Sequence, residues 1–140
     1  MVLRYGARLS TKDVDAVFVE PKRTAVVREL ATAVAEELGW EADWLNDGVK
    51  GYIGEAPPED ETLLHAPGVE VVSATVEQML ATKLSALRDA TDRADALTLM
   101  RDLDGSKEEV WARVEQYVQV ADLKACYAFE EIWEDLHGDD

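Results

Sequence analysis

The stretch that decides the fold runs Ser10-Thr11-Lys12-Asp13-Val14-Asp15-Ala16-Val17-Phe18-Val19. Read as a β-strand, its two-residue period places two carboxylates and two valines on one face, at Asp13, Asp15, Val17 and Val19. The other face is apolar, with Val14, Ala16 and Phe18. Alternate strand positions lie roughly 6.5 to 7 Å apart along the backbone, so two short acidic side chains can converge on one or two Mg²⁺ ions. The stretch therefore predicts a strand that carries a metal site.

The same residues have a simpler interpretation. An Asp-x-Asp at the edge of a strand also arises as turn chemistry on a solvated face. Carboxylates are depleted in strands, however, and here Asp13 and Asp15 stand at the start of a strongly apolar run. Nucleotidyl and phosphoryl transfer use a metal pair about 3.5 to 4 Å apart, and such a pair requires oxygen ligands of this kind.

Four blocks of the sequence carry a resemblance to a known family. Residues 8–18 resemble the Arg-x-x-Thr-x-Asp-[Ile/Val]-Asp signature of small nucleotidyltransferase-like proteins in the polymerase-beta superfamily, which includes AbiEii-type and MenT-type toxins. Further blocks, which resemble those of an uncharacterised bacterial branch, follow in the family's order, at residues 43–52, 69–84 and 92–97. The resemblance implies a nucleotidyltransferase-like fold over roughly residues 4 to 103.

The resemblance also implies roles for individual residues. Asp13 and Asp15 would bind Mg²⁺ in a two-ion site, with Glu70 as the third acid from a later strand. Lys83 would neutralise the charge of a triphosphate, and Asp95 would orient Lys83 or touch the substrate. The remaining candidates for nucleotide contact are Arg8 and Lys50.

Each of these later residues also has an alternative interpretation, in which it has a structural or surface role and no part in catalysis or binding. Glu70 can be the outward residue of an alternating strand, and Lys50 can be an ordinary surface lysine. Lys83 lies at or beside an apolar helix stripe, where a lysine can extend its ammonium to water. Asp92 and Asp95 can be solvated or pair with Arg88 and Arg93 on a helix.

One part of the family's pattern is not in the chain. Members carry a Gly-Gly-[Ser/Thr/Ala] turn at a helix start just upstream of the acidic strand, and residues 1–8 resemble only the end of that helix and its linker. The turn would hold the triphosphate through free backbone N–H groups. Two expectations follow: the start is assigned too far downstream, or the protein has lost the chemistry and acts as a protein-binding module.

Composition limits the remaining choices. The 140 residues carry a net charge of −16, yet residues 1–28 hold six cations against three acids, which is +3 and leaves −19 for the rest. This acidic body disfavours broad nucleic-acid binding but permits a small anionic substrate or a local RNA contact at the basic end. With one cysteine, Cys126, and two histidines, we expect no internal disulfide and no zinc site of the usual ligand set. The single cysteine also suits a protein located in the reducing cytoplasm. No apolar run is long enough to predict a membrane span.

The periodicity predicts the following elements. A helix over 21–38 has apolar positions at Val26, Val27, Leu30, Val34 and Leu38 and ends at Gly39. A short helix over 41–50 is anchored by Trp40 and Trp44, and a loop covers 54–60. Strands at 61–65 and 69–73 flank a turn at 66–68, and with the first strand they make a sheet of at least three. Helices begin at Thr75, Ser106 and Asp122, and Asp89, Asp92 and Asp95 share one helical stretch.

These observations predict an α+β protein with a small mixed β-sheet, helices packed on it and a helical carboxyl-terminal half. We expect one domain over residues 1–140, with a sheet-bearing part at 1–74 and a helical part at 75–137. The leading function is Mg²⁺-dependent transfer of a nucleotide from a nucleoside triphosphate to an RNA, protein or small-molecule acceptor, in the manner of a toxin of a toxin–antitoxin pair. The alternatives are an inactive domain that binds an antitoxin-like or regulatory protein, and a metal-dependent phosphohydrolase. Whether the protein is a monomer or a homodimer is left open.

Overall fold

The computed structural model describes residues 14–16, 18, 21–46, 62–120 and 122–138. The chain divides into two compact units, Met1–Gly51 and Tyr52–Asp140, and each is described by itself below. The expected single domain, with parts at 1–74 and 75–137, stays a prediction. None of the helices in the described ranges is long and apolar enough to cross a lipid bilayer.

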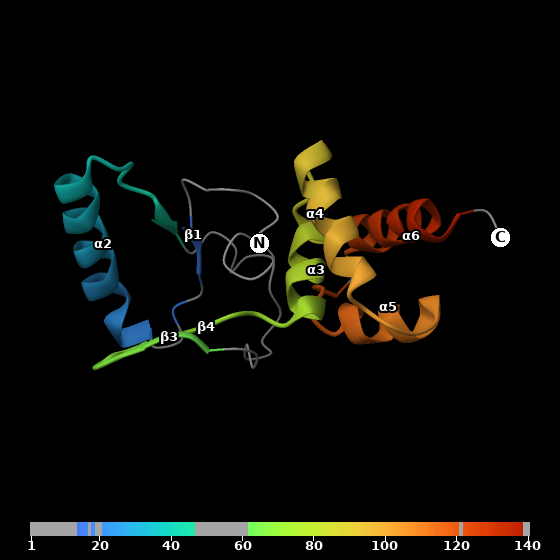
Figure 1. Cartoon of the computed structure of the whole chain (residues 1–140), viewed down its shortest axis with the longest axis horizontal. Helices are drawn as coiled ribbons and strands as arrows, with labels where there is room; N and C mark the ends of the chain where they lie inside the picture. Colours follow the sequence, from blue (N-terminus) through green and yellow to red (C-terminus); the bar gives the residue numbers. More distant parts are fainter. Residues whose placement is uncertain (1–13, 17, 19–20, 47–61, 121, 139–140) are drawn as a thin grey trace. The chain divides into compact units, whose positions relative to one another are not determined.

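The described part of the first unit is a strand–helix–strand arrangement (Figure 1). Strand β1 (Val14–Asp15) leads through the short 3-10 turn η1 (Pro21–Arg23) into helix α2 (Thr24–Leu38), and strand β2 (Leu45–Asn46) follows. β1 and β2 pair in parallel, with Val14 opposite Leu45 and Asp15 opposite Asn46. Parallel neighbours need a crossover of a dozen or more residues, and α2 supplies it.

Helix α2 confirms the predicted helix over 21–38. Its end is fixed by Gly39, which adopts a φ of 70° and donates its N–H to the carbonyl of Ala35. The predicted buried stripe is wrong in part, because Val26, Leu30 and Leu38 are exposed while Ala31 and Ala35 are buried. The alanine side is the one that the β2 segment covers, since the Trp44 indole bonds to the Ala31 carbonyl.

The predicted short helix over 41–50 is wrong in its described part, because residues 42–44 turn and residues 45–46 form β2. The backbone of this segment pairs with β1 instead: Val14 donates its N–H to the Trp44 carbonyl at 2.6 Å and Ala16 to the Asn46 carbonyl at 2.9 Å. The anchoring role is confirmed for Trp44, whereas Trp40 is 53% exposed. The Trp44 Nε1–H donates to the Ala31 carbonyl at 2.9 Å, and the rings of Trp40 and Trp44 meet edge to face at 5.2 Å.

The second unit begins, in its described part, with the predicted hairpin. Strands β3 (Thr62–Ala66) and β4 (Val69–Val72) pair antiparallel, with Leu64 opposite Val71 and His65 opposite Glu70. The two-residue turn between them contains Gly68 at a φ of 79°, a value that glycine adopts without strain. The expected single mixed sheet of three or more strands differs from what the described residues show, which is two separate two-stranded pairs. The strands of each pair are joined by their own connection, α2 in one case and a two-residue turn in the other, so each pair can form without the other.

The rest of this unit is helical. Helices α3 (Val76–Ser85), α4 (Ala90–Arg101), α5 (Lys107–Glu115) and α6 (Leu123–His137) pack together, with α3 in contact with the other three (Figure 1). The fully buried apolar core comes from all four helices and includes Leu80, Leu84, Leu99, Met100, Val110, Val114, Phe129 and Ile132. The α+β class and the helical carboxyl-terminal half are thus confirmed, and the nucleotidyltransferase-like fold stays a prediction.

Polar side chains at the helix starts explain why the four helices begin where they do. Thr75, Asp89, Ser106 and Asp122 each accept a hydrogen bond from a backbone N–H three residues further on. Ser106 and Glu109 form the predicted capping box. Asp89 is the N-cap of α4, so the expectation that it shares one helical stretch with Asp92 and Asp95 is wrong. The Asp89 carboxylate accepts the Asp92 N–H, which has no carbonyl partner in the first turn of α4.

Candidate functional site

The strongest cluster of charges in the described residues surrounds Lys83, in the last turn of α3. Its ammonium lies 3.0 Å from Asp95 Oδ2 and 3.4 Å from Asp92 Oδ1, and both aspartates belong to the first half of α4. The Lys83 side chain is 26% exposed, whereas those of Asp92 and Asp95 are 8% and 6% exposed. The cluster is therefore buried on its acidic side and open at the lysine.

The connection between α3 and α4 shapes this cluster. Asp92 Oδ2 accepts the backbone N–H of Arg88 at 3.1 Å and the Arg88 Nε–H at 3.2 Å. The N–H of Asp92 donates to the N-cap carboxylate of Asp89 at 2.9 Å. These bonds tie the first turn of α4 to the end of the preceding connection. We call Lys83, Arg88, Asp92 and Asp95 the Lys83 cluster.

Two opposing effects set the ionisation of Asp92. Burial raises the pKa of its carboxyl, but the side-chain and backbone hydrogen bonds from Arg88 and the charges of Lys83 and Arg88 lower it more, so the pKa falls below its ordinary value. Asp92 is therefore ionised at neutral pH, and its negative charge faces two cations.

The cluster has a definite chemical capacity. Two cations and two carboxylates make it neutral overall, which suits a structural ion cluster at a helix joint. An ammonium carries three N–H donors, and Asp92 and Asp95 occupy two of them. The third can donate to a phosphate oxygen at the open side of Lys83.

The acidic strand is described only in part. Arg8, Asp13 and Lys50, all candidates from the sequence, lie outside the described residues, as does the expected lead-in at residues 1–9. Asp15 lies in β1 at the register position opposite Asn46, and the structure describes its backbone alone. Ala16 and Phe18 of the predicted apolar face are half-buried, whereas Val14 of the same face is exposed, so this prediction is confirmed only in part.

Glu70 lies in β4 of the second unit. It is exposed, and its Oε1 accepts a hydrogen bond from Thr62 Oγ1 across the hairpin at 3.3 Å. Among the residues that the structure describes, no three histidine, cysteine or acidic side chains are arranged to hold a metal ion. The carboxylates of Asp92 and Asp95 are bonded to cations, which makes them poor Mg²⁺ ligands. A role for Glu70 at the metal therefore stays a proposal.

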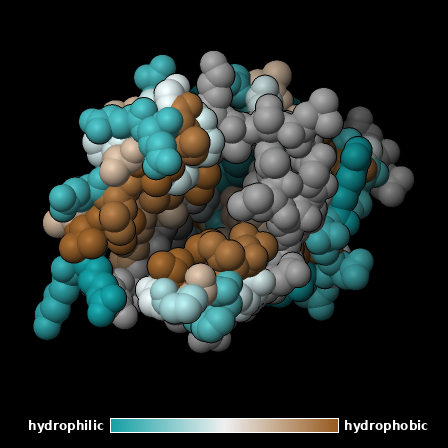
Figure 2. All heavy atoms as spheres, turned by 60° about the vertical axis from the view of Figure 1, so that its left-hand side comes forward, coloured by the Kyte–Doolittle hydropathy of each residue, from teal (hydrophilic) through white to brown (hydrophobic). Residues whose placement is uncertain are grey.

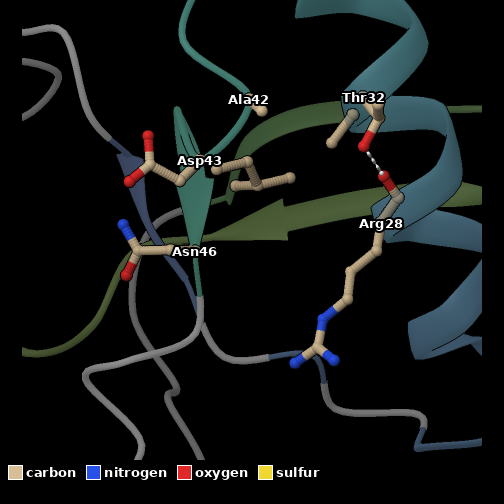
Figure 3. Close-up of a pocket in the computed structure, with 7 residues that line it drawn as sticks. Arg28, Thr32, Ala42, Asp43 and Asn46 are labelled. Atoms are coloured by element: carbon tan, nitrogen blue, oxygen red, sulfur yellow. Dashed lines mark hydrogen bonds between the residues drawn. The ribbon is translucent and has the colours of Figure 1, made fainter.

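A pocket of about 270 Å³ lies within the first unit, between α2 and the β2 segment. Arg28 and Thr32 come from α2, and Thr32 Oγ1 donates to the Arg28 carbonyl at 3.0 Å (Figure 3). The carboxylate of Asp43 and the amide of Asn46 point away from α2 in Figure 3. Because these polar groups do not converge, the pocket is a weak candidate for a charged ligand. In the sequence Arg28 counts only as one cation of the basic amino-terminal end, and Thr32 has no predicted role; their four-residue spacing on one helix face is the signal that could have paired them.

Comparison with known proteins adds no assignment to this site. No protein-family model, no curated protein and no solved structure matches the chain.

Proposed function

We propose that this chain is a nucleotidyltransferase-like protein that transfers a nucleotide from a nucleoside triphosphate to an RNA, protein or small-molecule acceptor. The observation that supports the proposal most is the geometry of Lys83. The lysine that the resemblance assigns to the triphosphate is held by Asp95, the residue that the resemblance assigns to orienting it. Among the described residues, two carboxylates take up two of the three ammonium donors, and the exposed side of Lys83 can receive a phosphate oxygen.

In the proposed reaction an acceptor hydroxyl attacks the α-phosphorus in line. The bond to the β-phosphate breaks, and pyrophosphate leaves. Asp13 and Asp15 would hold Mg²⁺, which would supply charge neutralisation for the phosphates. Lys83 donates to a non-bridging phosphate oxygen, and Asp95 keeps the ammonium directed at it. Arg8, Lys50 and Glu70 remain the proposed supporting contacts.

Label transfer tests this function. The chain is incubated with Mg²⁺ and each nucleoside triphosphate labelled at the α-phosphate, with bulk RNA or the protein itself as acceptor. Transfer moves the label into the acceptor, while hydrolysis releases it as free nucleotide and so reports the phosphohydrolase alternative. The Asp13→Asn, Asp15→Asn double variant is expected to lose transfer.

A lysine pair provides the matched control for this assay. Lys83→Met should lose transfer, whereas Lys124→Met removes an exposed lysine from α6 and should keep it. Equal activity in the two lysine variants would contradict the role of Lys83. Circular dichroism spectra of both variants verify that each is folded.

A second function is favoured by different observations. The Lys83 cluster is neutral as it stands, and Figure 2 shows brown areas of apolar residues at the surface. The exposed large apolar side chains include Leu38 and Trp40 in the first unit and Leu64, Val69 and Val71 in the β3–β4 hairpin. An inactive domain that binds a protein, such as an antitoxin, would expose such surface. This candidate predicts no label transfer with any nucleotide and binding of a protein partner in its place.

A further inference from the structure

Helix α6 presents two different faces to its surroundings. Its inner face, with Ala125, Ala128, Phe129 and Ile132, is buried in the helical core of the second unit. On the opposite side Leu123 is 65% exposed and Tyr127 is 68% exposed, although both are large and apolar in their bodies. Val120, just before the helix, is fully exposed. Because α6 already has a packed core side, these residues are not needed for the core.

The exposed apolar pair continues into acidic residues along the same face. Helical spacing places Glu130 and Glu134 beyond Leu123 and Tyr127, at steps of three to four residues. Glu131 and Asp135 flank them, and Arg93 pairs with both, while Lys107 pairs with Glu130. Two cations thus pair with three of these acids, and Glu134 adds a fourth negative charge. We call Leu123, Tyr127, Glu130 and Glu134 the outer face of α6.

The charge of the whole unit bears on what could cover this face. Residues 52–140 hold 21 acids and seven cations, a net charge of −14, against −2 for residues 1–51. A second copy would bring the same excess of acid, and like charges across an interface oppose association. A basic partner would be attracted to the same surface. Its apolar side chains would cover Leu123 and Tyr127, and its cations would meet the acids one to two turns further along.

We propose that the outer face of α6 binds a basic amphipathic helix of another protein. A helix is the matching shape, because the face itself runs about 16 Å along one helix from Leu123 to Glu134, and two helices pack with residues at three- to four-residue steps in register. This proposal does not depend on nucleotidyl transfer and holds for an active or an inactive domain.

Fluorescence anisotropy with a labelled 18-residue helical peptide tests the proposal. The peptide carries leucines at three- and four-residue steps along one face and lysines beside them, and a second peptide has glutamate in place of every lysine. The lysine peptide should bind the wild-type chain, more weakly as salt rises, and the glutamate peptide should not. Failure of the lysine peptide to bind would overturn the proposal.

Variants separate this face from general attraction of a basic peptide to an acidic protein. The Leu123→Ser, Tyr127→Ser double variant keeps every charge and should weaken binding about tenfold or more. The matched control is Val26→Ser, Leu30→Ser, another exposed pair four residues apart on a helix, and its affinity should be unchanged. Equal affinity of the two double variants would overturn the proposal. So would a dimer in sedimentation that the α6 variant abolishes, since a second copy would then occupy the face.

Discussion

The ammonium of Lys83 lies 3.0 Å from the buried carboxylate of Asp95, across the joint between α3 and α4. Asp92 contributes a second carboxylate at 3.4 Å. The pairing holds Lys83 in one position while its side chain keeps contact with solvent. In the proposed transferase that position is where a phosphate oxygen would meet the ammonium, and in an inactive domain the same pairing would fix the angle between the two helices.

Lys83→Met should destabilise the protein by about 1 to 3 kcal/mol, because it removes the ammonium beside the buried carboxylate of Asp95 and one of the two cations beside Asp92. The partial exposure of the lysine reduces the cost below that of a fully buried pair. Lys83→Arg keeps the charge and should cost less. Urea denaturation followed by circular dichroism measures both. A methionine variant as stable as the wild type would show that the ion pairs contribute nothing.

Asp92→Asn should destabilise the protein by about 1 to 3 kcal/mol at pH 7, because the amide cannot provide the charge that Arg88 and Lys83 face. Since the pKa of Asp92 is lowered in the folded state, this carboxylate stabilises the fold above its ordinary pKa and loses that effect as the pH falls through the folded-state value. The stability difference between wild type and variant should therefore shrink below about pH 4. A difference that is constant from pH 7 to pH 3 would contradict the assignment.

Ser106→Ala removes one half of the capping box at the start of α5. The Ser106 Oγ accepts the Glu109 N–H at 3.3 Å, and Glu109 accepts the Ser106 N–H at 2.8 Å. The expected loss of stability is about 1 kcal/mol, and Ser106→Asp, which can cap in the same way, should restore most of it. Thermal unfolding of the three proteins checks the ranking. If aspartate fails to restore stability, the serine acts through something other than its cap.

Trp44→Phe keeps the aromatic contact with Trp40 and removes the indole N–H that bonds to the Ala31 carbonyl. The first unit should lose about 1 kcal/mol of stability. Hydrogen exchange of α2 amides measures the effect locally, and amides of α3 to α6 provide the internal control. Protection of α2 that stays unchanged would mean that the indole does not anchor the helix.

Local signals in the sequence predicted much of the fold. The N-caps at Thr75, Ser106 and Asp122, the C-cap at Gly39 and the hairpin turn at Gly68 each follow from the chemistry of one or two side chains. These features are set by neighbours in the chain, which is why a sequence pattern is sufficient to find them.

Longer-range pairing was harder to predict. Residues 45–46 form a strand because residues 14–16, about thirty positions away, provide backbone hydrogen-bond partners. The local sequence around residues 45–46 does not indicate this pairing. The exposed side of α2 was misjudged for the same reason, since an apolar stripe does not say which part of it a neighbour will cover. For the candidate site, the sequence resemblance predicted that Asp95 orients Lys83 or touches the substrate, and the two side chains are in contact in the structure. It did not anticipate the close approach of Asp92 to Lys83 or its backbone bond from Arg88.

The central claim, a nucleotide site that uses the acidic strand, is tested most directly by isothermal titration of each Mg²⁺–nucleoside triphosphate into the wild-type chain and into the Asp13→Asn, Asp15→Asn double variant. We expect saturable binding of at least one triphosphate by the wild type, and loss of that binding in the double variant while its circular dichroism spectrum is unchanged. Absence of binding to the wild type, or equal binding to both proteins, would contradict it.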